Sequence, residues 1–322
     1  MSNILQPAGR YIELKKIVVF FFSAVQAIVV RCPHWAMRRY VLIVSSMCRN
    51  LLSGVWAVRC RNVVLSTPWP PISLPPLAVS FGGQRLKLVP HLGQDDGDAL
   101  WFRKMPYEAG VASWVGARVA NDYDVVIEIG ANVGLYTCLL GILAKGQSRL
   151  KRVYAFEPSV EAFRRLQVNL ESNKLLGVVT FQAAVAEESG FLDFFQPLGH
   201  LTNGSLRKDF AAHFDGGVSG SSVVTIAAIH LMTLLVPGDR ALIKIDVEGF
   251  EPKLLEALIP LMNQYNPDLI IEILPETESD IVAWAAKTGY VSTLLIEDAV
   301  VVQGPIIANP VHRDWLLQRR TG

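Results

Sequence analysis

One short segment constrains the fold of this chain most: an apolar strand pattern, a turn that contains two glycines, and an apolar helix pattern. The strand pattern covers residues 124–129, the turn covers 130–134 (Gly-Ala-Asn-Val-Gly), and the helix pattern continues to about residue 144. Glycines at the end of a strand let a ligand approach the backbone closely. The amides that begin the following helix favour a carboxylate or phosphate. The segment therefore predicts a strand–turn–helix unit with a ligand site at its turn.

The same alternation of strand and helix continues along the chain. It predicts an α/β fold whose mostly parallel sheet is doubly wound, with helices on both faces. Two further patterns, at 290–296 and 299–302, predict an antiparallel hairpin at the end of the sheet. The other predicted strands are 152–157, 177–185, 190–196, 222–226, 241–246 and 268–274, and the other predicted helices are 161–172, 250–264 and 279–288.

The N-terminal part of the chain has a different composition. Residues 1–61 carry nine Lys or Arg and one Glu, a net charge of +8, whereas the rest carries 21 basic and 28 acidic residues, a net charge of −7. Five prolines between residues 67 and 76 favour an extended linker. We therefore predict three parts: a basic, apolar helical arm at 1–66, a proline-rich linker at 67–77 and the α/β domain at 78–322.

The residue pattern of the arm predicts two helices. Its longest apolar run, 17–30, has fourteen residues, fewer than the roughly 20 that a membrane-spanning helix needs. A second, amphipathic helix is predicted from Trp35 to about Trp56. Such a basic helix can lie on an anionic membrane surface or pack against protein, and the sequence leaves both alternatives open.

Three further features bear on partners and location. We expect no nucleic-acid partner, because the basic residues are spread along apolar helices without a binding motif. We expect no signal peptide, because Arg31, Cys32 and Pro33 follow the apolar run in place of a small-residue cleavage site. Four cysteines without a pattern suit a reducing compartment. The predicted location is therefore cytoplasmic, with peripheral membrane contact through the arm as an open alternative.

Acidic residues stand at the ends of the predicted strands. In an open parallel sheet, ligands bind outside the carboxyl ends of the strands, and burying an unpaired carboxylate is costly. Any one of these residues could instead cap a helix or hold an arginine, but the whole set indicates a ligand site. Its members are Glu128, Glu157, Asp246, Glu248 and Glu272.

The turn after the first strand indicates which class of nucleotide ligand the site would bind. It lacks the G-x-G-x-x-G dinucleotide fingerprint, because Asn132 stands at the second glycine position and the third glycine is missing. Glu157, 27 residues after Gly130, can accept hydrogen bonds from both hydroxyls of a ribose. A nucleoside with a carboxylate tail fits this combination better than a pyrophosphate does, which favours S-adenosylmethionine.

Several motifs in the same order resemble those of the FkbM family of S-adenosylmethionine-dependent methyltransferases. Residues 126–137 resemble V-I-D-V-G-A-N-I-G-Y-Y-T, with Glu128 in place of Asp, and residues 153–158 match V-Y-A-F-E-P. Residues 203–206 resemble N-x-S-L, and 242–251 resemble L-I-K-I-D-V-E-G-x-E. The resemblance covers about residues 107–274 and implies a seven-stranded methyltransferase sheet.

The resemblance also implies roles for individual residues. Glu157 should hold the ribose, and Ala184 and Val185 should lie beside the adenine. Lys244, Asp246 and Glu248 should face the methyl-transfer side, with Glu272 nearby. The methionine part of the cofactor should be surrounded by Glu128, Gly130, Asn132 and Gly134.

A hydroxyl acceptor is a weak nucleophile until its proton leaves, so a general base is expected. Asp246 and Glu248 are the first candidates, and His200 is the best placed histidine, although it can equally be an ordinary loop residue. Asp246 and Glu248 could also hold a divalent ion, but two carboxylates are weak evidence and no His/Cys grouping has zinc spacing. We therefore predict no metal site.

The function predicted from these features is O-methylation of a hydroxyl on a sugar, a glycolipid or a secondary metabolite. One alternative is an NAD-dependent oxidoreductase, which the departures from the dinucleotide fingerprint disfavour. The other is a non-catalytic docking protein that retains the fold, which the complete set of strand-end carboxylates disfavours. Nothing in the sequence identifies the acceptor.

Overall fold

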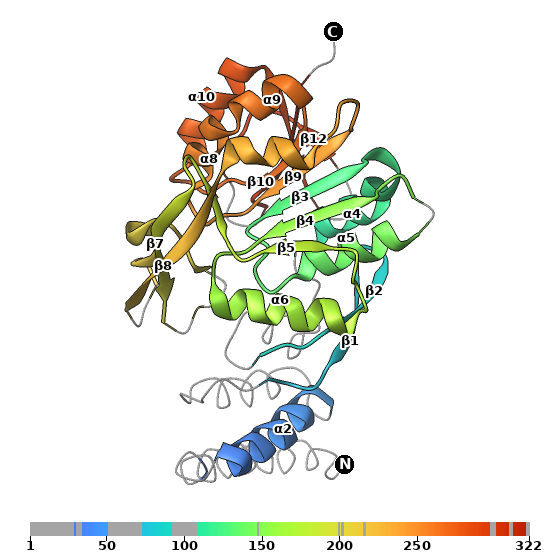
Figure 1. The fold of residues 1–322 in the computed structure, drawn as a ribbon. Coiled ribbons are helices and arrows are strands. Elements are labelled where there is room, and N and C mark those ends of the chain that lie inside the picture. The colour runs from blue at the N-terminus through green and yellow to red at the C-terminus, as the bar shows by residue number, and fades with distance from the viewer. Residues whose placement is uncertain are drawn as a thin grey trace, which may run out of the picture. The chain divides into compact units, whose positions relative to one another are not determined.

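The computed structural model describes residue 29 and residues 34–50, 73–91, 108–146, 148–198, 200, 203–214, 217–296, 301–308 and 312–319 (Figure 1). The predicted helix at 17–30, apart from residue 29, and the linker residues 67–72 lie outside this range. The chain divides into two compact units, one formed from 1–76 with 89–105 and the other from 77–88 with 106–322. We call them the N-terminal unit and the sheet unit.

The N-terminal unit contains one described helix, α2 (His34–Asn50). It agrees with the described part of the amphipathic helix predicted from Trp35. Val41 and Val44 are buried, whereas Trp35 and Ile43 are exposed. Within the described residues, no helix combines the length and the apolar character needed to cross a membrane.

The sheet unit is built on an eight-stranded sheet with the order β12-β11-β13-β10-β9-β3-β4-β5 (Figure 1). The five strands from β10 to β5 are parallel, and the other three are antiparallel to their neighbours. The bounds are β3 Val125–Ile129, β4 Arg152–Phe156, β5 Val179–Phe181, β9 Ala241–Ile245, β10 Asp268–Glu272, β11 Tyr290–Leu295, β12 Val301–Gln303 and β13 Asp314–Arg319.

Helices cover both faces of this sheet, which confirms the doubly wound α/β prediction. The odd-numbered residues of β3, such as Ile127, belong to a core that also includes Leu254, Met262 and Trp284 from the helices after β9 and β10. The helices of that face are α8 (Glu251–Ala257), α9 (Ile259–Tyr265) and α10 (Glu278–Thr288), and those of the other face are α4 (Ala109–Asp122), α5 (Leu135–Lys145) and α6 (Val160–Ser172).

The end of the sheet is more elaborate than predicted. The hairpin of β11 and β12 is present and antiparallel. However, β13 lies between β10 and β11 and pairs with both, so the sheet has eight strands and not seven. No pattern predicted β13, because its apolar centre is only three residues long, from Trp315 to Leu317.

Two predicted elements are each divided in the structure. The strand predicted at 177–185 becomes β5 and a separate strand, β6 (Ala184–Ala186), which pairs with β8 (Val218–Ala227) in a second sheet completed by β7 (Gly190–Pro197). The apolar pattern runs through this change of sheet, so periodicity could not reveal it. The helix predicted at 250–264 is interrupted at Leu258, because Pro260 has no N–H to donate to the preceding turn.

A short antiparallel hairpin joins β1 (Leu77–Phe81) to β2 (Gln84–Leu88). Gly82 and Gly83 both have positive φ, as a two-residue type I′ turn requires. The remaining described helices are the short α7 (Lys208–Ala211) and the 3-10 helix η3 (Ala228–Leu234).

Candidate functional site

The turn between β3 and α5 has a conformation that only glycine can adopt at its first position. Gly130 has φ 87°, and a Cβ atom there would lie 1.7 Å from the carbonyl oxygen of Asp246. The amides of Gly130 and Ala131 both donate to the carbonyl oxygen of Phe156, at 3.0 and 2.9 Å. Gly134, with φ 83°, is the N-cap of α5 and provides no side chain to cap it. The turn is therefore tied to β4 on one side and to the end of β9 on the other.

Glu157, directly after β4, fastens two segments of the site together. Its Oε2 accepts a hydrogen bond from the amide of Asn132 at 2.8 Å, and its Oε1 accepts one from the amide of Ser159 at 2.8 Å. Burial raises the pKa of Glu157 to about 7, although both amide bonds act to lower it. Each carboxylate oxygen can accept more than one hydrogen bond, so both retain capacity for ribose hydroxyls.

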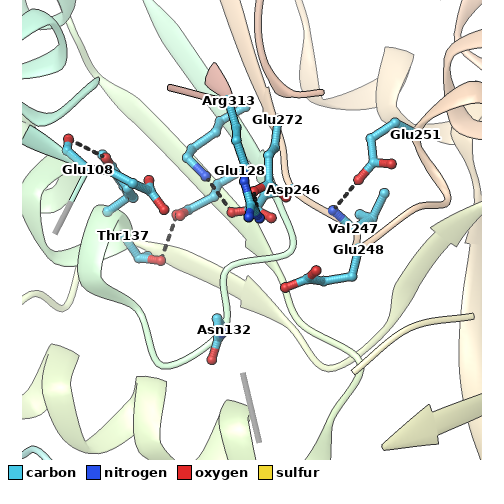
Figure 2. A network of polar contacts seen from close by, with 12 residues as sticks. Glu108, Glu128, Asn132, Thr137, Asp246, Val247, Glu248, Glu251, Glu272 and Arg313 are labelled. Carbon is cyan, nitrogen blue, oxygen red and sulfur yellow. Dashed lines mark hydrogen bonds and ion pairs between the residues drawn. The ribbon is translucent and has the colours of Figure 1, made fainter. Parts of the chain in front are cut away.

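The centre of the site is a buried arrangement on β3 and β9. Glu128 and Lys244 lie opposite each other in the register of these strands. The hydroxyl of Thr137 donates to Glu128 Oε2 at 2.6 Å (Figure 2). Lys244 Nζ donates to Asp246 Oδ2 at 3.1 Å. Lys244 Nζ also lies 4.7 Å from the ring centre of Tyr136, a cation–π contact.

Burial and the neighbouring charges shift the pKa values of both Glu128 and Lys244. Burial raises the pKa of Glu128 to about 7, and Lys244 is the strongest influence in the opposite direction. For Lys244, burial acts to lower the pKa, but the surrounding carboxylates outweigh it, beginning with Asp246, so the pKa is raised. Lys244 is therefore a cation that binds Asp246 directly and acts on Glu128 through its charge.

Further carboxyl groups gather around this centre. Glu272 ends β10, and its Oε1 lies 3.4 Å from a guanidinium nitrogen of Arg313 (Figure 2). Burial raises the pKa of Glu272 to about 8, with Asp246 as the next cause. Burial also raises the pKa of Glu248 and of Asp314 well above their ordinary values. We call the following set the carboxyl cluster: Glu108, Glu128, Asp246, Glu248, Glu272 and Asp314.

The loop after β9 places Glu248 in a left-handed conformation, with φ 54°. Glu251, fully buried at the start of α8, supports this loop by accepting the amides of Val247 and Gly249 on Oε1 at 3.1 and 3.2 Å (Figure 2). From the other side, Ser205 donates its hydroxyl to the carbonyl oxygen of Glu248 at 2.7 Å, and Asn203 donates its amide to Glu248 Oε1 at 3.3 Å.

The structure therefore brings most of the predicted residues together, but not His200. Within the described residues, the ring of His200 contacts Phe214, with ring centres 5.2 Å apart, and its backbone carbonyl accepts the amide of Asn203 at 3.2 Å. Ala184 and Val185 lie on β6, both buried, and Val185 shares a core with the main sheet. Their adenine role stays a prediction.

Sequence reasoning missed several residues of the site. Glu251 could have been found, because it ends the D-V-E-G-F-E motif and would point back at the loop from the first helical turn. Thr137 could have been found from its place in the first motif. Arg313 and Asp314 gave no signal, because they precede and begin the unrecognised strand β13.

The geometry fits a nucleoside cofactor that carries an amino-acid tail and a positive charge. The turn approaches Asp246 so closely that a side chain is excluded at Gly130. Glu157 can still accept hydrogen bonds from ribose hydroxyls, and the carboxyl cluster supplies negative charge. Within the described part of the chain, no group of three or more His, Cys, Asp or Glu side chains is arranged to hold a metal ion.

Several solved structures are similar to this chain. Among solved structures, the chain is similar to an FkbM methyltransferase from Methylobacillus flagellatus KT, with 16% identity, a TM-score of 0.41 and coverage of 62% of this chain but only 44% of that one. It is also similar to TYW2 from M. jannaschii in complex with AdoMet, with 15% identity, a TM-score of 0.33 and coverage of 78% and 87%. A third similar structure is precorrin-6y C5,15-methyltransferase from Geobacter metallireducens GS-15, with 13% identity, a TM-score of 0.35 and coverage of 66% and 87%.

A search of curated proteins found no match. The model of the methyltransferase FkbM domain, in contrast, matches residues 128–292. This match extends from Glu128 in β3 to Ser292 in β11, and it includes Glu157, Asp246 and Glu272. Because it spans just over half of the 322 residues, the chain belongs to the FkbM methyltransferase family.

Proposed function

We propose that this methyltransferase uses S-adenosylmethionine to methylate a hydroxyl group on a sugar, a glycolipid or a secondary metabolite. The observation that carries the proposal is the joining of Glu157 to the turn at Asn132 beside the carboxyl cluster. This places an acceptor for ribose hydroxyls next to a backbone cradle and next to negative charge. A nucleoside with a sulfonium group is complementary to all three features.

The chain's own residues would divide the work of binding and catalysis. Glu157 would orient the ribose, and Gly130 and Gly134 would let the backbone approach the amino-acid tail. When bound, S-adenosylmethionine supplies an electrophilic methyl group. Lys244 holds Asp246 at 3.1 Å, so Asp246 is fixed in orientation, while Glu248 and Glu272 are the carboxyl groups with raised pKa that can exchange a proton. Holding donor and hydroxyl in line would supply much of the rate.

The two alternative functions keep less support. An NAD-dependent oxidoreductase would need space for a pyrophosphate at the turn, and Asn132, with φ 51°, occupies the second glycine position there. A docking protein without catalysis has no need of a carboxyl cluster at the strand ends, because burying these groups costs stability.

Glu157→Ala is expected to weaken S-adenosylmethionine binding at least tenfold, measured by calorimetric titration, because it removes the ribose acceptor and releases the amide of Asn132. Asp193→Asn is a control that removes a carboxylate from the exposed part of β7, and it should bind as the wild type does. Unchanged affinity in Glu157→Ala would remove Glu157 from the ribose role.

The acceptor itself calls for a different measurement. We expect a deletion strain to contain a metabolite or glycan that is lighter by one methylene, detected by mass spectrometry. We propose that the acceptor is not a nucleic acid.

We propose a cytoplasmic location, with the N-terminal unit as a docking element for a membrane or for protein. Arg39 and Trp35 are exposed on α2, which suits a membrane surface, whereas Val41 and Val44 are buried, which suits packing. Flotation with anionic liposomes decides between them. Membrane docking predicts that the full chain floats and that a chain lacking residues 1–66 does not; equal flotation of both rules it out.

A further inference from the structure

The carboxyl cluster contains more negative groups than the cations beside it can balance. Among the described residues, the carboxyl groups of the cluster also interact with Glu157 and Glu251, and Lys244 and Arg313 are the cations that act on the cluster. Lys244 lies in β9 and Arg313 directly before β13. Carboxylates of like charge in a partly buried site cannot all be ionised, so they hold protons in common.

The contacts show which carboxyl groups already have a fixed polar partner. Asp246 forms its ion pair with Lys244 at 3.1 Å. Glu128 lies opposite the same lysine and accepts the hydroxyl of Thr137. Both therefore have a fixed partner within the buried centre of the site.

Glu272 has a weaker partner. Its side chain is 17% exposed, and Arg313, with 46% of its side chain exposed, approaches it only to 3.4 Å, longer than the 2.7–2.9 Å typical of a charged hydrogen bond. The charged groups that face Glu272 come from four places: Asp246 and Glu248 after β9, Glu251 in α8, Glu108 before α4, and Arg313 with Asp314 at β13. Five of these six are acidic, which favours the protonated form of Glu272.

A charge bound at the turn of residues 130–134, which we call the cofactor cradle, would also act on Glu272. The carbonyl oxygen of Asp246 borders the turn at Gly130, and the carboxylate of Asp246 acts on both Glu157 and Glu272. A positive charge bound between the cradle and the ends of β9 and β10 would therefore be felt at Glu272.

We propose that Glu272 carries a proton in the free enzyme and loses it when the positively charged sulfonium of S-adenosylmethionine binds. The proposal rests on the proposed function, because it assumes that cofactor. The carboxylate that can accept the proton of the acceptor hydroxyl then forms only when the methyl donor is present. In the transfer, the carbon–sulfur bond breaks with its electron pair left on sulfur, the carbon–oxygen bond forms, and the hydroxyl proton moves to Glu272.

The products then restore the starting state. The sulfur is a neutral thioether and Glu272 is protonated again, so the site has lost the attraction between its carboxylate and the cofactor charge. Glu272 would thus help the enzyme to distinguish the methyl donor from the spent cofactor.

Calorimetric titration of the full chain tests this proposal without knowledge of the acceptor. S-adenosylmethionine and S-adenosylhomocysteine are titrated in two buffers of different ionisation enthalpy, with a chelator present, and the number of protons released is compared. The two cofactors have the same amino-acid tail, so their difference reports the sulfonium charge. Because the pKa of Glu272 is about 8, we expect close to one additional proton released at about pH 7. The affinity for S-adenosylmethionine should then rise about tenfold per pH unit up to about pH 8.

Two variants locate the proton. Glu272→Gln should remove most of the additional proton, whereas the surface control Asp193→Asn should leave it unchanged. Arg313→Gln, at an exposed residue, should increase proton release at about pH 8, because Arg313 lowers the pKa of Glu272. This second variant keeps the test decisive if Glu272→Gln fails to fold.

The outcomes separate the two proposals. If the wild type does not bind S-adenosylmethionine, the proposed function fails. If it binds both cofactors with equal proton release, or if Glu272→Gln releases as many protons as the wild type, the role of Glu272 is overturned while the cofactor assignment stands.

Discussion

Gly130→Ala is expected to abolish cofactor binding and to lower the free energy of unfolding by about 3 kcal/mol or more. A left-handed backbone costs a non-glycine residue roughly 1–2 kcal/mol. The added Cβ would also lie 1.7 Å from the carbonyl oxygen of Asp246, so the turn or the loop after β9 must move. Such overpacking adds about 1–3 kcal/mol. Urea unfolding and titration with S-adenosylmethionine measure the two effects.

Gly238→Ala provides a matched control. Gly238 has φ 91°, close to the 87° of Gly130, but no atom lies within 4 Å of the Cβ that would be added. It should therefore show only the backbone cost of roughly 1–2 kcal/mol and bind the cofactor normally. Equal stability losses in the two variants, with normal binding in both, would contradict the close approach of the turn to Asp246.

Lys244→Met is expected to destabilise the fold by about 3–5 kcal/mol at pH 8, because it leaves buried carboxylates without their cation. Lys244 and Glu128 are 4% and 1% exposed, so water cannot replace the lysine beside Glu128, whereas the Asp246 side chain is 28% exposed and is partly hydrated. Lys244 lowers the pKa of Glu128, so removing it raises the pH at which the carboxyl groups take up protons. The loss in the free energy of unfolding should therefore be largest above the pKa of Glu128 in the variant. It should shrink as the pH falls and the carboxylates become neutral.

Lys287→Met is the control for this prediction. Lys287 forms an ion pair with Glu256 at 3.0 Å, as close as that of Lys244, but both side chains are more than half exposed. Exposed pairs contribute little, so this variant should stay close to the wild type at every pH. A Lys244→Met variant that behaves like Lys287→Met would show that the interactions of Lys244 with Asp246 and Glu128 do not stabilise the site.

Those parts of the fold where a strand pattern and a motif coincide could be predicted from the sequence. Strands β3, β4, β9 and β10 lie within about two residues of their predicted ends, because each is a short apolar run that ends in a carboxylate or a glycine turn. Glu128, Asp246 and Glu248 therefore come together as predicted, since the carboxyl ends of parallel strands share one edge of the sheet.

What could not be predicted depends on contacts between distant segments. Arg313 and Asp314 reach the site only because β13 inserts antiparallel beside β10, with Glu272 opposite Asp314, and no local pattern records that pairing. The role of Glu251 is a hydrogen-bonding one, visible only once the loop is folded back over it. The ring of His200 packs against Phe214, a contact that its residue type did not predict, and its catalytic role stays a prediction.

Calorimetric titration of the full chain with S-adenosylmethionine and, separately, with NAD tests the central claim most directly. The account predicts saturable one-to-one binding of S-adenosylmethionine that is weakened in Glu157→Ala, and no binding of NAD. Binding of NAD alone, or of neither cofactor, would contradict it.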